Sequence, residues 1–170
     1  MAESAPEPVP DKPHAPGYGF ETAKRKPGEL LPWGRVTEWL EAARNYWVVT
    51  TRPDGRPHAA PVWGLWLDGA VLFSTGPGSR KGRNLAANPA LVVHLESGDN
   101  VAILEGTAAE VTDAGLRTRF ADAYKAKYNF RPDPDDPNGL VYALRPTVAF
   151  AWRETDFPES ASRWRFPAPD

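Results

Sequence analysis

The residues best suited to chemistry lie in one segment, residues 70–89, which reads AVLFSTGPGSRKGRNLAANP. A short apolar run typical of a β-strand precedes a Gly-Pro-Gly turn. Ser79, Arg80 and Lys81 follow, and a helix-like stretch is expected from about Gly82 to Ala87. A helix N-terminus attracts anions, because it presents free N–H groups and the positive end of the helix dipole. Arg80 can hold phosphate oxygens through two parallel hydrogen bonds, and Lys81 adds a point charge. The order of these residues therefore predicts a phosphate-binding turn.

The sequence does not decide between alternative roles for two polar residues beyond the turn. On a helix, Arg83 points away from Lys81, so it is either a more distant phosphate contact or a solvated cation. Asn84 lies three residues after Lys81, where it can cap or orient the cations. The expected phosphate subsite comprises Ser74, Thr75, Ser79, Arg80, Lys81, Arg83 and Asn84.

The same segment resembles the flavin-binding segment of the pyridoxamine 5′-phosphate oxidase family. In that family, the pattern F-[FY]-T-N-x-x-S-R-K-x-x-x-[LI], followed by N-P, holds the phosphate of FMN. A weaker resemblance extends from about Leu40 to Trp152. It implies the split β-barrel of FMN-binding proteins, and a homodimer with the cofactor in a groove between the subunits. The matching positions here are Phe73, Ser74, Thr75, Ser79, Arg80, Lys81, Leu85, Asn88 and Pro89.

The resemblance also places residues 58–67 along the flavin ring. The oxidase itself has basic residues where Ala60 and Leu65 stand here, so the resemblance does not extend to pyridoxamine phosphate oxidation. The run PVW at 61–63 instead resembles the branch that uses the deazaflavin coenzyme F-420, in which D-G-x-P-x-x-x-P-[VI]-[WY] precedes K-x-x-N-L. The resemblance implies coenzyme F-420 as the preferred cofactor and FMN as the alternative. Ring contacts are expected from His58, Pro61, Val62 and Trp63.

Two functions fit such a site. The first is an oxidoreductase that passes hydride between the cofactor and a small, largely apolar substrate, with Trp63 and Trp66 flanking the ring pocket. The cofactor would carry the reactive atom, so no catalytic side chain is assigned. The second is a non-catalytic carrier or sensor for FMN, deazaflavin or haem. The alternative to a ring pocket is that alternate tryptophans simply fill the barrel core.

Other chemistries lack their residues. The chain has no Cys, and His58 and His94 stand without further ligands at metal-binding spacing, so no metal site is predicted. The nucleophile elbow G-x-S-x-G is absent. The glycines at 76, 78 and 82 follow G-x-G-x-x-x-G, which differs from the dinucleotide fingerprint.

Composition favours a cytoplasmic protein that binds neither nucleic acid nor membrane. The formal net charge of the 170 residues is −2, and no apolar run approaches the ~20 residues of a membrane span. The first residues are acidic and proline-rich, unlike a secretory signal. We expect a disordered or extended tail over residues 1–28, a barrel domain over 29–156, and a C-terminal tail over 157–170 that packs on the barrel.

The hydrophobic periodicity predicts an α+β fold built on a split barrel of about six antiparallel strands. A helix is expected around Val36–Ala43 and another from Leu116 to Tyr128, beside the short one after the basic turn. The last strand contains Pro146, where a break is expected because proline has no N–H to donate to a neighbouring strand. The strands are expected at 46–51, 58–67, 70–75, 91–96, 101–111 and 141–152.

Overall fold

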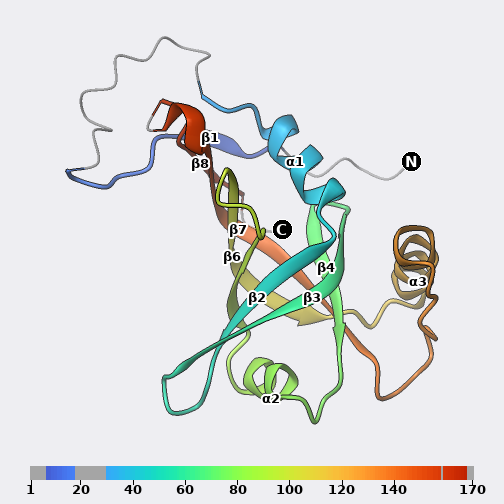
Figure 1. Ribbon diagram of the computed structural model, residues 1–170. Coiled ribbons are helices and arrows are strands. Elements are labelled where there is room, and N and C mark those ends of the chain that lie inside the picture. Colours follow the sequence, from blue (N-terminus) through green and yellow to red (C-terminus); the bar gives the residue numbers. More distant parts are fainter. Residues whose placement is uncertain (1–6, 18–29, 158, 168–170) are drawn as a thin grey trace.

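The computed structural model describes residues 7–17, 30–157 and 159–167 (Figure 1). Six antiparallel strands close a barrel in the order β7-β4-β3-β2-β5-β6, with β6 pairing back onto β7. This confirms the predicted α+β split barrel. The barrel strands are β2 (Asn45–Thr51), β3 (Pro57–Leu67), β4 (Ala70–Thr75), β5 (Ala90–His94), β6 (Asn100–Glu110) and β7 (Leu140–Arg153).

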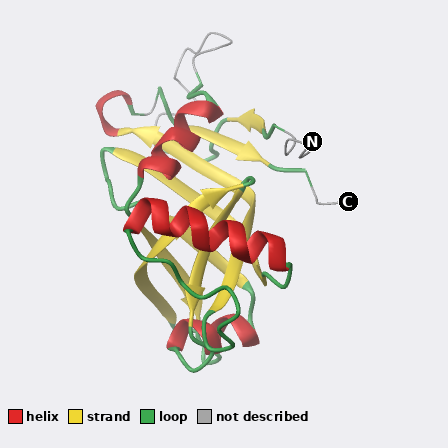
Figure 2. Cartoon of the chain, turned by 90° about the vertical axis from the view of Figure 1, so that its right-hand side faces the viewer, coloured by secondary structure: helices red, strands yellow, loops and turns green. Residues whose placement is uncertain are grey.

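The helices cover the barrel at its ends and on one side. α1 (Trp33–Ala42) and α2 (Arg80–Ala87) lie at opposite ends of the barrel (Figure 1). The longest helix, α3 (Ala114–Tyr128), crosses the outside of the strands, in front of them in Figure 2. Within the described residues, no helix is both long and apolar enough to cross a bilayer.

Alternation along the strands produces two apolar clusters, because successive side chains point to opposite faces of a sheet. Odd-numbered residues of β4 face the barrel interior, whereas Leu72 faces α3. Since α3 covers the outer face, β4 is buried on both sides. The interior is filled by Val48, Val71, Phe73, Val93, Leu104 and Leu144, among others. The cluster beneath α3 includes Leu65, Leu72, Val111, Phe120, Tyr128 and Val141.

The last barrel strand runs unbroken through Pro146, so the expected break there is wrong. Its partner β6 shifts register between Glu105 and Gly106, and Gly106 lies opposite Pro146. An irregularity of this kind accommodates a residue that cannot donate to the ladder. Gly106 also allows a close approach, because a Cβ there would lie 2.4 Å from the carbonyl oxygen of Arg145.

Two short strands extend the sheet beyond the barrel. β8 (Ser162–Arg165) pairs with β7, and β1 (Val9–Asp11) pairs with β8. Trp164 is only 1% exposed, and its ring lies 5.3 Å from that of Trp33 at the start of α1. Residues 1–6, 18–28, 158 and 168–170 of the two expected tails, and residue 29 of the expected barrel domain, lie outside the described residues.

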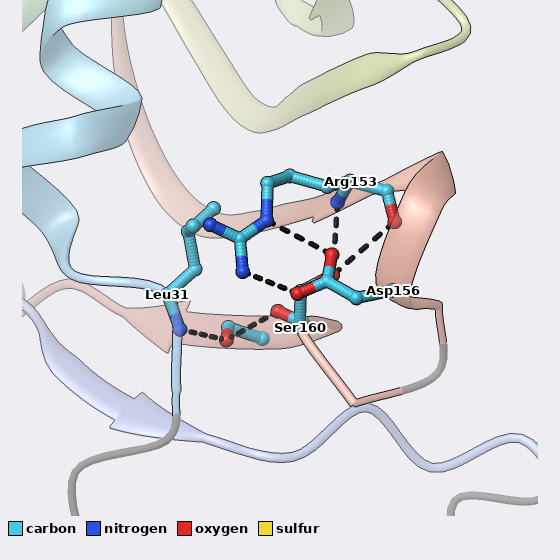
Figure 3. A network of polar contacts seen from close by, with 5 residues as sticks. Leu31, Arg153, Asp156 and Ser160 are labelled. Carbon is cyan, nitrogen blue, oxygen red and sulfur yellow. Dashed lines mark hydrogen bonds and ion pairs between the residues drawn. The ribbon is translucent and has the colours of Figure 1, made fainter.

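A polar network fastens the C-terminal segment to this end of the barrel (Figure 3). The amide of Leu31 donates to Ser162 Oγ at 2.9 Å, and Ser162 Oγ donates to the carbonyl oxygen of Ser160 at 2.9 Å. The amide of Arg153 donates to Ser160 Oγ at 2.9 Å, and Arg153 Nε donates to Asp156 at 2.9 Å. The network thereby satisfies two buried hydroxyls with protein partners.

Candidate functional site

The turn between β4 and α2 is held by its own hydroxyls. Ser79 is the N-cap, and its Oγ accepts a hydrogen bond from the Gly82 amide at 2.9 Å. Thr75 Oγ1, at the end of β4, lies 2.8 Å from Ser79 Oγ. A Cβ at Gly82 would lie 2.4 Å from the carbonyl oxygen of Gly76, so only glycine fits there without distortion. The helix therefore begins at Arg80, two residues earlier than the expected Gly82.

This cap leaves donors available at the start of α2. Ser79 accepts the Gly82 amide through Oγ and the Arg83 amide through its carbonyl oxygen, and no described residue accepts a hydrogen bond from the backbone amides of Arg80 and Lys81. Within the described part of the chain, neither side chain pairs with a carboxylate. Burial lowers the pKa of Lys81, as expected for a cation that lacks a counter-charge. The start of α2 thus combines free amides with two unpaired cations.

Two further basic side chains face the same turn from the β2–β3 hairpin. Burial lowers the pKa of His58, and the charges of Lys81, Arg52 and Arg80 lower it further. Among the described residues, His58 Nδ1 and Arg52 Nε are buried atoms that have no hydrogen-bond partner. We call Arg52, His58, Arg80 and Lys81 the cation cluster. Its charges repel one another unless an anion lies among them.

Arg52 was not expected from the sequence. It follows β2, some thirty residues before Arg80, and nothing in its local sequence marks it. The signal lies in the pairing register, in which Thr50 opposes His58, so the hairpin carries Arg52 and His58 to the same end of the barrel. The acidic residue of this hairpin, Asp54, pairs with Arg56, whose Nη2 lies 2.8 Å from Asp54 Oδ2. Hydrogen bonds from Arg56 lower the pKa of the Asp54 carboxyl, and the charges of Arg52 and Arg80 lower it further.

Asn84 and Arg83 support the turn rather than extend the cation cluster. Asn84 is fully buried, and its Nδ2 donates to Thr50 Oγ1 at 2.9 Å, which ties α2 to β2. Its Oδ1 has no partner among the described residues. The exposed Arg83 donates through Nη1 to the carbonyl oxygen of Gly78. Both side chains therefore fix the path of the backbone that presents the free amides.

The structure does not bring Ser74 to the cation cluster. Successive strand residues face opposite ways, so Thr75 points toward Ser79 while Ser74 points outward. Ser74 instead lines a cavity of about 220 Å³ between α3 and the loop that follows it, together with Phe120 and Val141. Of Ser74 and Thr75, only Thr75 therefore places its hydroxyl beside the turn.

The two tryptophans of β3 do not flank one pocket, so that expectation is wrong. Trp63, which is 39% exposed, stacks on Tyr128 of α3 at 4.7 Å, and the guanidinium of Arg44 lies 5.4 Å from its ring. Trp66 faces the other way and meets Trp33 at 6.0 Å. Residues an odd number apart on a strand lie on opposite faces, which separates the two rings.

The remaining expected ring contacts divide between the two faces of β3. His58 and Val62 share the face that includes the interior cluster, whereas Pro61 and Trp63 are exposed on the other. His58 and Trp63 are also separated along the strand by about 16 Å, at ~3.3 Å per residue. A single ligand that contacts the cation cluster can therefore follow β3 only along one face.

The family model for pyridoxamine 5′-phosphate oxidase matches residues 33–153, which span all six barrel strands and the cation cluster. The chain belongs to the pyridoxamine 5′-phosphate oxidase family. No match was found among curated proteins.

Solved structures agree with this family member in fold. A conserved hypothetical protein from Mycobacterium tuberculosis is 19% identical with a TM-score of 0.66, covering 76% of this chain and 90% of its own. An F420 reductase is 24% identical with a TM-score of 0.55, covering 66% and 93%. A heme binding protein from Mycobacterium smegmatis is 21% identical with a TM-score of 0.57, covering 75% and 55%. At these identities the likeness shows the fold alone.

Proposed function

We propose that this member of the pyridoxamine 5′-phosphate oxidase family is an oxidoreductase that binds the phosphate of a flavin-type cofactor at the cation cluster. The supporting observation is the set of unpaired cations beside the free amides of Arg80 and Lys81. Because like charges held together destabilise the fold, the cluster favours a bound anion that offsets them. A phosphate fits this donor set, since Arg and Lys side chains and helix N-terminal amides all donate to its oxygens.

Coenzyme F-420 is the proposed cofactor, with FMN as the alternative. Arg52 adds a permanent cation to the cluster, so charge alone suits the dianionic FMN phosphate as well as a phosphodiester. The preference for F-420 rests on the PVW run at 61–63 and on Ala60, which shares a strand face with His58. Leu65 carries less weight, because it is buried beneath α3, where a basic residue would meet apolar neighbours. A solved F420 reductase with the same fold supports the proposal.

The chain's own residues would bind and orient this cofactor. Arg80 and Lys81 hold its phosphate, while Ser79 and Thr75 fix the turn that presents them. The part of β3 that carries His58 and Ala60, nearest the cation cluster, would contact the cofactor beyond its phosphate. When bound, a deazaflavin or flavin ring supplies the atom that takes or gives hydride. The substrate we propose is small and largely apolar, and the assembly a homodimer.

Titration of the purified protein with coenzyme F-420 and with FMN, at one fixed ionic strength, tests this proposal. We expect F-420 to bind at micromolar concentration or tighter, about −8 kcal/mol, and FMN at least about tenfold more weakly. Reduced F-420 should then be oxidised in turnover with small apolar acceptors. Equal binding of FMN would transfer the assignment to FMN. Binding without any turnover would favour a carrier, and co-purified haem would favour the haem-binding alternative.

A further inference from the structure

The cavity beside α3 is lined by charges of both signs that do not pair with one another. It has a volume of about 220 Å³ and lies between α3, the loop that follows it, and the paired residues Ser74 of β4 and Val141 of β7. Arg117 of α3 lines this cavity, as do Asp133 and Asp136 of the loop. Within the described part of the chain, none of these three side chains forms an ion pair. We call this cavity the α3 pocket.

The guanidinium of Arg117 lacks the acceptor that its neighbours have. Its Nε is a buried atom, and no described residue accepts a hydrogen bond from it. By contrast, Arg119 Nη2 lies 2.8 Å from Asp68 Oδ2. Arg131 Nε, at the start of the loop, lies 2.8 Å from Asp122 Oδ1. Because a buried donor without a partner has lost its hydration for nothing in return, Arg117 favours an acceptor from outside the chain, and a carboxylate matches a guanidinium best.

The two aspartates of the pocket each use one carboxylate oxygen to shape the loop. Asp136 Oδ1 accepts a hydrogen bond from the Asn138 amide at 2.8 Å, and Asp133 Oδ1 accepts one from the amide two residues later at 2.9 Å. Among the described residues, the second oxygen of each has no hydrogen-bond partner. Asp133 is exposed, so water screens its charge, whereas Asp136 is half-buried. Asp136 is therefore the main negative charge of the pocket and suits an ammonium group.

The remaining wall of the pocket is mostly apolar. Burial against such a wall stabilises a hydrocarbon group of a ligand. At ~30 Å³ per water, a volume of about 220 Å³ equals roughly seven waters, which suits a molecule of fewer than about ten non-hydrogen atoms. The pocket thus fits a small hydrocarbon body that carries charged groups. Its apolar lining consists of Phe120, Ala121, Phe130, Pro132, Pro134 and Val141.

We propose that the α3 pocket binds a small zwitterion with an apolar body, of the class of the aliphatic α-amino acids. The ligand carboxylate accepts hydrogen bonds from Arg117, the ammonium donates to the unpartnered oxygen of Asp136, and the hydrocarbon body packs on the apolar lining. A ligand with a single charge would meet an opposing one, since an anion faces the aspartates and a cation faces Arg117. The proposal does not depend on cofactor binding, because the pocket shares no residue with the cation cluster.

Titration of the full-length protein with three related ligands, followed by NMR at one fixed ionic strength, tests the requirement for both charges. L-Leucine carries both charges, 4-methylpentanoate carries only the carboxylate, and 3-methylbutylamine carries only the ammonium. We expect leucine to bind with a Kd below about 1 mM and each analogue at least about tenfold more weakly, because each loses one charge-assisted hydrogen bond. Failure of leucine to saturate by about 10 mM, or equally tight binding of either analogue, would overturn the proposal.

Matched substitutions test whether leucine binds in the α3 pocket. Arg117→Gln removes the unpaired guanidinium, and Asp136→Asn removes the negative charge but keeps an oxygen for the Asn138 amide. Each should weaken leucine binding at least about tenfold, with circular dichroism as the check that the variants are folded. Arg119→Gln should leave binding unchanged, because this exposed guanidinium on the same helix pairs with Asp68. An equal loss in Arg119→Gln, or undiminished binding in both pocket variants, would contradict the assignment.

Discussion

The two ends of the barrel differ in whether their basic side chains pair with carboxylates. At the end covered by α1 and β8, Arg153 pairs with Asp156 in a network that includes the hydroxyl of Ser160 (Figure 3). Arg163 pairs with Asp11 at the same end. At the end covered by α2, neither Arg80 nor Lys81 pairs with a carboxylate of the described chain. At the first end both guanidinium groups pair with carboxylates of the chain, although Arg163 Nε has no partner among the described residues. The second end leaves the amides of Arg80 and Lys81 and the charges of their side chains without a partner among the described residues.

The difference follows from what each end contains. Trp164, Trp33 and Phe166 fill the α1 end, with Trp33 and Phe166 5.1 Å apart, so charges there stay at the rim. At the α2 end, the Gly-Pro-Gly turn brings backbone rather than large side chains to the surface. We therefore assign stability mainly to one end and, under the proposed function, cofactor binding to the other. Substitutions at the two ends should separate these properties.

Trp164→Ala should have the largest effect on folding. The ring is 1% exposed and packs against Trp33, so its removal should lower the free energy of unfolding by about 3–5 kcal/mol. Chemical denaturation monitored by circular dichroism measures this loss. Cofactor affinity of the remaining folded protein should be unchanged, and a parallel loss of affinity would show that the two ends are not independent.

Gly82→Ala should affect the binding end. The new Cβ would approach the carbonyl oxygens of Gly76 at 2.4 Å and Pro77 at 2.9 Å, so the turn must shift and carry the free amides with it. We expect at least about tenfold weaker cofactor binding, on the order of 1.5 kcal/mol. Isothermal titration measures it, with Gly78→Ala as the matched control because a Cβ there meets no atom within 4 Å. Equal affinities of the two variants would contradict the role of the turn.

His58 should make cofactor binding depend on pH. The cations around it lower its pKa in the free protein, and a bound phosphate that offsets them should raise it. Binding then takes up a proton, so affinity should rise severalfold as the pH falls from 8 toward 5. Coenzyme F-420 is the appropriate ligand, since a phosphodiester does not titrate in this range whereas a monoester does. His58→Gln should flatten the profile, and His94→Gln should leave it intact.

Arg163→Ala should have the smallest effect of these substitutions. Its ion pair with Asp11 lies near the surface, where such pairs contribute about 0–1 kcal/mol to stability. The salt bridge holds the pKa of the Asp11 carboxyl below its usual value, so its contribution is lost as pH falls through that range. Thermal unfolding at pH 7 and pH 3 measures the difference, and a large effect on cofactor affinity would contradict the division between the ends.

The sequence was most informative where local patterns decide structure. Short β-prone runs separated by hairpin turns predicted the six barrel strands, and the residues after the Gly-Pro-Gly turn predicted the short helix α2, although not its cap at Ser79. The cap is a local device, because Ser79 needs only the amide of Gly82 three residues later. The phosphate role of these residues stays a prediction, as do the homodimer and the cytoplasmic location.

What the sequence missed depends on distant partners. The continuity of β7 at Pro146 requires Gly106 opposite it, and the short strand Val9–Asp11 forms only because β8 lies beside it. Arg52 joins the cation cluster through the strand register rather than through any local motif. The prediction that Trp63 and Trp66 flank one pocket needed no distant partner to be corrected. The two residues are three apart on one strand, and this spacing alone places their side chains on opposite faces.

The central claim, that the cation cluster binds the phosphate of the cofactor, is tested most directly by calorimetric titration of Arg80→Ala and Lys81→Ala with coenzyme F-420. Each substitution removes a charge-assisted hydrogen bond, so each should weaken binding by about 1.5–3 kcal/mol. Arg153→Ala, at the opposite end of the barrel, should bind as the unaltered protein does. Unchanged affinity in both Arg80→Ala and Lys81→Ala would contradict the account.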